Sequence, residues 1–289
     1  MNRTIFFMVC FPLLLCGCAG SGAGSGGQSD PNPLKVALLP DESPSTVIAN
    51  NEKLKEYLQR ELARDIELVV TTDYSTMIEA VRHGRIHVAY FGPLSYVLAR
   101  QKTEIEPFAA LKTKDGTTYK AVLIANVAAG IDSVADIKGK DVAFGDTAST
   151  SSHLIPRGML AEKGLIADVD YQARFVGAHD TVALTVQTGR APAGGLSKPI
   201  FESLLERGII DRNKVRVLQE SRLYPQYPWT MRSDLKSELK ERIRKAFLSL
   251  HDPEVLRPFK AEGFGPVSDQ DYDVIRDLGK LLNLDLSKF

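Results

Sequence analysis

Apolar residues along the chain alternate between short continuous runs and amphipathic helical stretches. The first pair is a strand pattern over residues 34–40 and a helix pattern over residues 45–63, with apolar side chains near i, i+3, i+4 spacing. Residues 66–72, 74–84 and 86–92 continue in the order strand, helix, strand. This alternation predicts an α/β fold with a parallel sheet and crossover helices.

A second α/β set follows a long strand pattern over residues 118–127. Strand patterns at 141–145, 171–177 and 214–219 then alternate with helices expected over about 152–164, 180–189 and 199–208. The chain is expected to cross between lobes near residues 115–125 and to return near 221–232. We therefore predict one lobe from 34–118 plus 228–289 and a second from 119–227. Ligands of open parallel sheets bind at the carboxyl ends of the strands, which predicts an interlobe cleft.

The residues before the first strand have the composition of a leader and a linker. Arg3 and the apolar stretch after it predict a signal peptide over residues 1–17, too short to span a bilayer comfortably. It ends in "LCGC", the pattern of bacterial lipoproteins, in which Cys18 is lipidated and becomes the new N-terminus. The alternative is an ordinary signal peptide with chance cysteines. Residues 18–33 are predicted to be a flexible Gly/Ser tether.

Charge and cysteine content exclude several classes of protein. The 289 residues contain 36 Lys plus Arg and 36 Asp plus Glu, so no net field attracts nucleic acid or a membrane surface. Cys10 and Cys16 leave with the leader, which leaves no thiol pair in the mature chain. His83 and His87 are separated by the predicted helix end, and there is no Cys or His cluster. We expect no metal and no cofactor.

The stretch "GDTASTSSHLIP", residues 145–156, places hydroxyl side chains between an apolar strand and a helix. Pro156 is tolerated only near a first helical turn, which sets the helix start at Ser151 or Ser152. A helix N-terminus offers unpaired N–H groups, and the hydroxyls of Ser149, Thr150 and Ser151 add donors without charge. This combination predicts a site for a tetrahedral oxyanion. The alternative is that one serine caps the helix and the others belong to a polar loop.

Other candidate ligand contacts come from a histidine and from aromatic side chains at predicted strand ends. His179 follows a strand pattern and stands at a second helix start, from which it can donate to the same anion. Tyr119 and one of Tyr227 or Trp229 stand where the chain crosses between lobes, and we expect them to close over a small ligand. The aromatic set considered comprises Tyr74, Tyr90, Phe91, Tyr119, Tyr227 and Trp229.

A hydrolase is the main alternative from a different class. It would use a serine of the 149–152 stretch as nucleophile, His179 as base and Asp180 to orient the base. The sequence has no G-x-S-x-G elbow that would fix one serine as nucleophile. The glycine-rich residues 20–27 lack the lysine of a phosphate-binding loop and precede the fold.

Four segments together resemble one known family. They are "STSSHLIP", "VGAHDTVALTVQTG", "DYSTMIEAVRHGRIHVAYFGPLSYVLA" and "TTYKAVLIAN". The family comprises the substrate-binding lipoproteins and periplasmic proteins of phosphonate, phosphite and phosphate ABC transporters, and the likeness covers about residues 34–265. It implies a two-lobed type II periplasmic-binding-protein fold with a hinge and an interlobe ligand cleft.

The resemblance also implies roles for individual residues. Ser149, Thr150 and Ser151 match the segment that donates to the phosphonyl oxygens. Three further residues match single ligand contacts of the family, namely His179, Tyr74 and Tyr119.

Departures from the family pattern bear on the ligand. Relatives that bind aminoalkylphosphonates place carboxylates where this chain has "GGLSKP" and "YPQYPW", with Lys198, Pro199 and Tyr227. An ammonium group finds no acid at those positions, so a small ligand without an amine fits better. Tyr227 and Trp229 are candidates for an apolar wall, and Asp41 or Asp73 is a candidate acceptor for a protonated ligand oxygen.

These observations predict an extracytoplasmic solute-binding component of an ABC importer that is not an enzyme. The expected ligand is phosphite, with methylphosphonate or phosphate as competitors, 2-aminoethylphosphonate poor, and a sulfonate as a weaker alternative. We expect a monomer, located in the periplasm or at the cell surface, that meets the membrane only through its lipid anchor. Its expected partner is an ABC permease, and no nucleic acid is involved.

The predicted anchor can be tested independently of the ligand site. Cys18→Ser is expected to move the protein from the membrane fraction to the soluble fraction and to leave phosphite affinity unchanged, because the tether separates the anchor from the fold. Cell fractionation and calorimetry measure the two effects. Loss of binding in a soluble domain that starts near Pro31 would contradict this separation.

Overall fold

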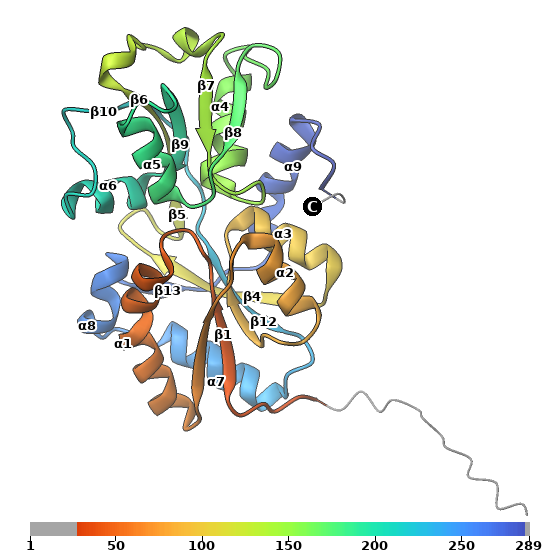
Figure 1. Cartoon of the computed structure of the whole chain (residues 1–289). Helices are drawn as coiled ribbons and strands as arrows, with labels where there is room; N and C mark the ends of the chain where they lie inside the picture. Colours follow the sequence, from red (N-terminus) through yellow and green to blue (C-terminus); the bar gives the residue numbers. More distant parts are fainter. Residues whose placement is uncertain (1–27, 287–289) are drawn as a thin grey trace, which may run out of the picture.

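The computed structural model describes residues 28–286, whose strands form two large sheets and a small one (Figure 1). The six-stranded sheet of lobe 1 has the order β13-β4-β12-β3-β1-β2, and the five-stranded sheet of lobe 2 has the order β10-β6-β9-β7-β8. Lobe 1 contains β1 (Leu34–Leu38), β2 (Ile66–Val70), β3 (Val88–Tyr90), β4 (Ile105–Lys112), β12 (Pro228–Arg232) and β13 (Gly263–Gly265). Lobe 2 contains β6 (Ala121–Asn126), β7 (Asp141–Phe144), β8 (Gln172–Phe175), β9 (Ala193–Ser197) and β10 (Val215–Glu220).

Both sheets are mixed, with three parallel strands at one edge of each. In lobe 1, β1 pairs in parallel with β2 and β3, whereas β12 runs antiparallel to β3 and β4. In lobe 2, β7 pairs in parallel with β8 and β9, whereas β6 is antiparallel to β9 and β10. Every residue of β6 and of β9 is buried, as expected for strands covered on both faces. The fold is the predicted two-lobed type II arrangement.

Helices cover the faces of both sheets (Figure 1). Lobe 1 carries α1 (Pro44–Leu62), α2 (Tyr74–Arg82), α3 (Pro93–Lys102), α7 (Ser237–Leu248) and α8 (Pro253–Leu256). Lobe 2 carries α4 (Ile155–Ala161), α5 (His179–Gln187) and α6 (Lys198–Glu206), and α9 (Asp273–Leu281) follows near the C-terminus. Short 3-10 turns occupy η1 (Val127–Ala129), η2 (Val134–Ile137), η4 (Arg257–Phe259) and η5 (Asp269–Tyr272).

A two-stranded ribbon joins the lobes. It consists of β5 (Thr118–Tyr119) and β11 (Tyr224–Pro225), which pair antiparallel with Tyr119 opposite Tyr224. The ribbon lies within the two crossings expected near residues 115–125 and 221–232. The single strand expected over 118–127 is wrong, because the chain leaves the ribbon after Tyr119 and re-enters a sheet at Ala121. This break places Tyr119 in the hinge.

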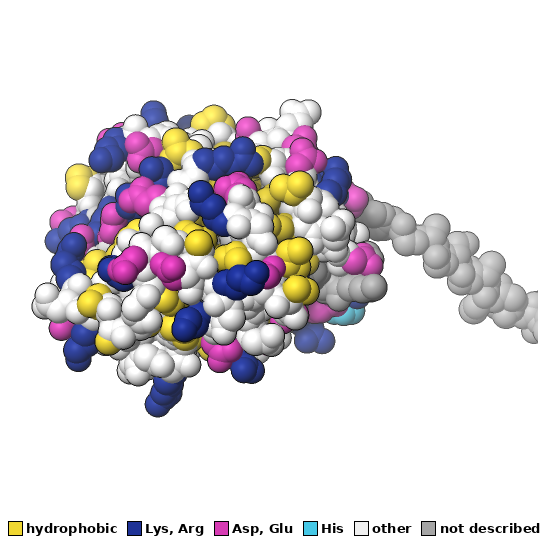
Figure 2. Space-filling model, turned by 90° about the horizontal axis from the view of Figure 1, so that it is seen from above, with side chains coloured by type: hydrophobic (Ala, Val, Ile, Leu, Met, Phe, Trp, Pro, Cys, Tyr) yellow, Lys and Arg dark blue, Asp and Glu magenta, His cyan; other side chains and the backbone are white. Residues whose placement is uncertain are grey.

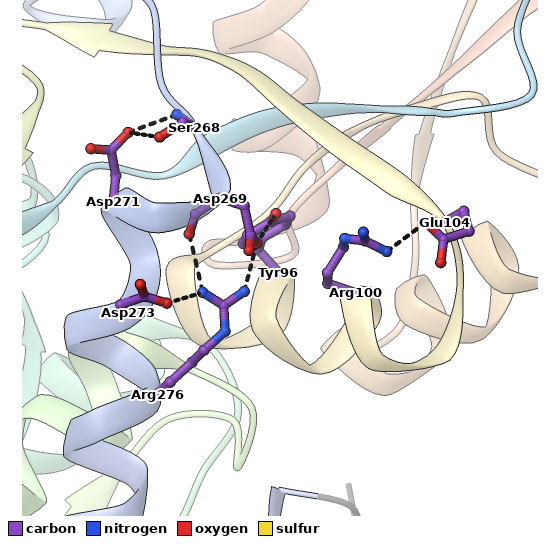
Figure 3. A network of polar contacts seen from close by, with 8 residues as sticks. All are labelled: Tyr96, Arg100, Glu104, Ser268, Asp269, Asp271, Asp273 and Arg276. Atoms are coloured by element: carbon purple, nitrogen blue, oxygen red, sulfur yellow. Dashed lines mark hydrogen bonds and ion pairs between the residues drawn. The ribbon is translucent and has the colours of Figure 1, made fainter.

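The C-terminal helix α9 lies beside both lobes. On the lobe 1 side, the Tyr96 hydroxyl of α3 donates to Asp269, and Arg276 pairs with Asp269 and Asp273 (Figure 3). On the lobe 2 side, Leu278 of α9 packs closely on Gly158 of α4. A Cβ added at Gly158 would lie 3.0 Å from a Leu278 methyl group. The helix is therefore fixed to α3 by polar contacts and rests on α4 through apolar ones.

The end of the predicted tether is bound to lobe 1. The Ser29 N–H donates to the Asp234 carbonyl at 2.7 Å, and Asp30 forms ion pairs with Arg64 and Lys236. The prediction of a flexible tether over 18–33 therefore does not hold for Ser29 and Asp30, which are bound to lobe 1. The predicted signal peptide, Cys18 and the first part of the tether lie outside the described residues.

The surface agrees with the balanced charge of the chain. On the face seen in Figure 2, Lys and Arg side chains are interspersed with Asp and Glu, and neither sign gathers in one patch. Among residues 28–286, the helices are too short or too polar to cross a bilayer.

Candidate ligand-binding site

The hydroxyl stretch begins a helix whose first turn is wider than an α-turn. A π-helix, η3, covers Thr150–Leu154 and leads into α4. Pro156 carries no N–H, so it leaves the Ser152 carbonyl without a helical partner. That carbonyl instead accepts the Gly145 N–H at 2.9 Å, which ties the helix start to the end of β7. The helix begins at Thr150, earlier than the Ser151 or Ser152 start predicted from Pro156, because a π-turn holds more residues than an α-turn.

The hydroxyls of this stretch are buried and already accept hydrogen bonds. Ser149 Oγ accepts the Ser152 hydroxyl at 2.8 Å and caps the helix. Thr150 Oγ1 accepts the Leu94 N–H of lobe 1 at 2.7 Å, and Ser151 Oγ lies 3.0 Å from the Tyr227 hydroxyl. A hydroxyl that accepts from the protein keeps its own hydrogen for donation. The stretch can therefore donate to a ligand while it caps the helix.

His179 presents a neutral N–H donor to the same region. Its Nδ1 accepts the Ser197 N–H at 3.0 Å, so the ring hydrogen belongs on Nε2. Nε2 is buried and has no partner among the described residues. Burial lowers the pKa of His179 to about 3, which keeps the ring uncharged at neutral pH. Such an orphaned donor is a group that a bound acceptor would satisfy.

Tyrosine side chains enclose the hydroxyl stretch. The Tyr119 hydroxyl is surrounded by Thr150, Ser151 and Tyr227 but forms no hydrogen bond, and it is the second buried polar group here without a partner. Burial also raises the pKa of Tyr74 well above its ordinary value, and the Ser149 hydroxyl beside it acts in the opposite direction. All the tyrosines are therefore neutral donors.

The residues predicted from the sequence converge on this one place between the lobes. They are Tyr74, Tyr119, Ser149, Thr150, Ser151, His179 and Tyr227, and none of these side chains is more than 5% exposed. None carries a positive charge at neutral pH. The arrangement offers several uncharged donors to an anion, which is the chemistry expected of an oxyanion site.

Two further residues belong to this place. Asp41 lies in the loop between β1 and α1. Burial raises the pKa of Tyr74, Tyr90 and Tyr227, and the nearby Asp41 carboxyl adds to that rise. Burial, with help from the nearby Glu42 carboxylate, raises the pKa of Asp41 to about 8. The sequence named Asp41 as one of two candidate acceptors but gave no reason to prefer it. Tyr90 was only one member of the aromatic set.

Two sequence candidates lie elsewhere. Asp73 caps α2, where its Oδ1 accepts the Thr76 N–H at 2.6 Å, and it does not reach the site. Trp229 is 1% exposed within the core of lobe 1, where it stacks on Tyr90 with ring centroids 4.8 Å apart. Tyr227 precedes the start of β12 and turns towards the hinge, whereas Trp229 lies within that strand and packs on Phe247 of α7. Tyr90 takes the place that the sequence assigns to Trp229.

A cavity of about 660 Å³ opens between the lobes next to these residues. Asp41, Tyr90, Tyr119, Tyr227 and Ser197 are among its lining residues, so it adjoins the hydroxyl stretch and His179 through them. Lys198 also lines it, but its ammonium pairs with Glu220 at 2.6 Å. The Lys198 ammonium is therefore already paired and adds no free positive charge to the cavity that leads to the donors. Residues 28–286 contain no cluster of His, Cys, Asp and Glu suited to a metal.

Two α/β lobes, a two-stranded hinge and buried donors between the lobes define a periplasmic-type solute receptor. A sequence profile described as the periplasmic phosphonate substrate-binding protein of ABC transporters matches residues 36–272. The chain belongs to this family, as its sequence motifs predict, and its location is extracytoplasmic.

Named relatives and solved structures agree with this assignment. The chain is 26% identical to a phosphate-import protein, PhnD, of Mycolicibacterium smegmatis, over 92% of each chain. It is 25% identical to a probable ABC-transporter phosphite-binding protein, PhnD1, of Prochlorococcus marinus, over 88% of this chain and 91% of that one. A structure of Prochlorococcus PhnD1 with methylphosphonate superposes with a TM-score of 0.79 at 23% identity, over 86% of this chain and 98% of that chain.

The unpartnered Tyr119 hydroxyl provides a test of the site. Tyr119→Phe is expected to weaken phosphite binding by about 1.5–3 kcal/mol, the worth of a hydrogen bond to a charged acceptor. The same change should not destabilise the ligand-free protein, because it removes a buried hydroxyl that has no partner. Calorimetry and thermal unfolding measure the two quantities.

Tyr171 supplies the matched control. Its hydroxyl is also buried without a partner, but its ring packs against Phe144 within lobe 2. Tyr171→Phe should leave phosphite affinity unchanged. Equal affinities of the Tyr119 and Tyr171 variants would place Tyr119 outside the ligand site.

Asp41 gives the site a pH dependence of known sign. Below about pH 8 its carboxyl is protonated and neutral, whereas above that pH its charge opposes an anionic ligand. Affinity for phosphite should therefore fall as the pH rises through 8 in the parent, relative to Asp41→Asn. The ratio of the parent and Asp41→Asn affinities at each pH removes the effect of the ligand's own titration.

The raised pKa of Asp41 also affects the stability of the fold. Its effect is opposite in sign to that of a carboxylate in an ion pair, whose pKa is lowered on folding. An acid whose folded pKa is raised lowers stability as the pH rises from its unfolded value, near 4, to about 8. Asp41→Asn should therefore unfold at a higher temperature than the parent at pH 7. Parallel pH profiles of parent and variant, in binding and in melting, would show that Asp41 titrates normally.

Proposed function

We propose that this chain captures phosphite for an ABC importer. The observation that carries the proposal is the pair of buried donors without partners, His179 Nε2 and the Tyr119 hydroxyl, beside the Ser149–Ser151 hydroxyls. Neutral donors can form hydrogen bonds to an oxyanion whatever the net negative charge of that oxyanion. The relatives' names, phosphate import and phosphite binding, and the neighbour's ligand, methylphosphonate, support a phosphorus oxyanion as the ligand class.

Phosphite is favoured by the distribution of donors and rings. It has three oxygens and a P–H bond that needs no hydrogen-bond partner. We assign the oxygens to the hydroxyl, imidazole and phenol donors, and the P–H direction to the rings of Tyr90 and Tyr227, whose centroids are 5.6 Å apart. The fourth oxygen of phosphate would meet that wall without a partner, at a cost of about 1–3 kcal/mol. A protonated oxygen of the ligand is assigned to Asp41.

The remaining features of the proposal rest on the sequence, with the paired ribbon as added support for the hinge. Lipidation at Cys18 anchors the mature chain, a permease receives the ligand, and the receptor acts as a monomer. The units that move are residues 34–118 plus 228–289 and residues 119–227, with the β5–β11 ribbon as hinge.

We also propose that the chain is not a hydrolase. A Ser/His/Asp mechanism requires the histidine to accept from a serine hydroxyl and to donate from its other nitrogen to a carboxylate. Here His179 Nδ1 accepts from the Ser197 backbone, and the Ser151 hydroxyl pairs with Tyr227. Asp180 points to backbone N–H groups instead of to the imidazole.

A calorimetric panel tests the ligand. We expect phosphite to bind tightest, methylphosphonate more weakly, phosphate and sulfate weakest, and 2-aminoethylphosphonate poorly. Phosphate should be about ten- to a hundredfold weaker than phosphite, which is the fourth-oxygen cost expressed as affinity. The panel includes the amine-bearing ligand because the cavity has room for a substituent on phosphorus and Asp41 is an acid beside it.

Tyr227→Glu sharpens the same test. It introduces an acid where amine-binding relatives are expected to carry one, so preference should shift from phosphite towards 2-aminoethylphosphonate. Trp229→Phe is the control, since that ring is in the core behind Tyr90 and the ligand order should not change. If the parent already binds 2-aminoethylphosphonate best, the phosphite assignment is wrong.

A further inference from the structure

Two aspartates of lobe 2 accept backbone N–H groups of lobe 1 across the cleft. Asp146 Oδ2 accepts the Tyr74 N–H at 3.3 Å, and Asp180 Oδ2 accepts the Ser43 N–H at 3.2 Å. These two carboxylates lie next to the candidate ligand donors of lobe 2. Asp146 lies three residues before Ser149, and Asp180 directly follows His179. Both contacts join segments that open apart when the lobes separate.

Each carboxylate is oriented by its own lobe. Asp146 Oδ1 accepts the Ala148 N–H at 2.7 Å, and Asp180 Oδ1 accepts the Thr181 N–H at 2.7 Å. One oxygen thus holds the side chain in place, and the other extends to the opposite lobe. The same arrangement occurs twice, once in the loop after β7 and once in the first turn of α5, and in both cases the carboxylate is a positioned acceptor.

The groups that these carboxylates meet are helix starts. Tyr74 is the first residue of α2, and Ser43 is the N-cap of α1, whose own side chain makes no capping bond. Helix N-termini carry a partial positive charge, so a carboxylate placed there is favourable. The Leu94 N–H, at the start of α3, is capped in the same way by Thr150. Lobe 2 therefore caps three helices of lobe 1.

The loop that carries Asp41 is held by the same contacts. The Asp41 carbonyl accepts the His179 N–H at 2.9 Å, and Glu42 forms an ion pair with Arg207 of α6. Together with the Ser43–Asp180 bond, these interactions attach three successive residues of lobe 1 to lobe 2. Closure thus places the Asp41 carboxyl beside the anion donors.

We propose that Asp146 and Asp180 are positioning residues that act as a latch and hold the lobes closed. Ligand affinity then depends on two carboxylates that stabilise the closed state without binding the ligand. When only the closed form binds, the measured dissociation constant is the intrinsic one divided by the closed fraction. Loss of a latch lowers that fraction and weakens every ligand of the site by the same factor. The inference uses the proposed function only for its choice of phosphite as probe.

Neutralising each carboxylate separates this role from simple electrostatics. Asp146→Asn and Asp180→Asn are expected to raise the phosphite dissociation constant about three- to tenfold each, with methylphosphonate and phosphate weakened by the same factor. Carboxylates that act only as negative charges near an anion would have the opposite effect, and their removal would tighten binding. Tighter or unchanged binding, or an altered ligand order, overturns the latch.

Asp136→Asn is the matched control. Asp136 also caps a helical turn through backbone N–H groups, but both its donors, Ser133 and Asp132, belong to its own lobe. Its variant should bind phosphite as the parent does. A loss equal to that of the Asp180 variant would assign the effect to helix capping in general and overturn the latch.

Small-angle X-ray scattering of the full mature chain gives a readout that needs no ligand. The ligand-free Asp146→Asn/Asp180→Asn protein should have a larger radius of gyration than the ligand-free parent. Saturating phosphite should return it to the parent value, which also shows that the variant is folded. Identical ligand-free radii overturn the latch. Absence of phosphite binding by the parent would instead contradict the proposed function, while the ligand-free comparison still tests closure.

Discussion

The hydrogen bond from the Ser197 N–H to His179 Nδ1 determines the chemistry of the whole site, because it decides which ring nitrogen carries the hydrogen. It forms because β9 ends beside the start of α5. β9 also needs small residues, since a Cβ at Gly195 would lie 2.4 Å from the Pro156 ring of α4, and a Cβ at Gly194 would lie 2.9 Å from Val186 of α5. These glycines let β9 pack closely against α4, which continues the helix begun by η3, and against α5, which begins at His179.

The donors brought together there are buried and uncharged, which has an energetic consequence. A buried Lys or Arg would need a permanent counter-ion when the cleft is empty. Hydroxyls and a neutral imidazole cost less to bury. In the meantime the Ser149 and Thr150 hydroxyls accept protein hydrogen bonds, and the Ser151 hydroxyl shares one with Tyr227. Among these donors, His179 Nε2 and the Tyr119 hydroxyl remain without a partner. The candidate site therefore keeps two unmet hydrogen bonds, which an acceptor in the cleft would satisfy.

Much of this was accessible from the sequence, because local patterns determine it. Strand and helix periods predicted two α/β lobes, and the hydroxyl run before Pro156 predicted a helix start with spare donors. The side of a strand on which Trp229 lies was not predictable, since it depends on where β12 begins and on a bulge after Trp229. The raised pKa of Asp41 depends first on its burial, then on the adjacent Glu42 and on Asp180 of the other lobe. The burial and the approach of Asp180 come from tertiary packing, which no local pattern shows.

The stacking of Trp229 on Tyr90 has an optical consequence. Trp229 is the single tryptophan of the chain, and the Tyr90 ring that it contacts lines the interlobe cavity. One aromatic ring therefore separates the dominant fluorophore of the protein from the place where a ligand would lie. Emission from this indole reports on the cavity and on the core of lobe 1 at once, without a label and without a change of sequence.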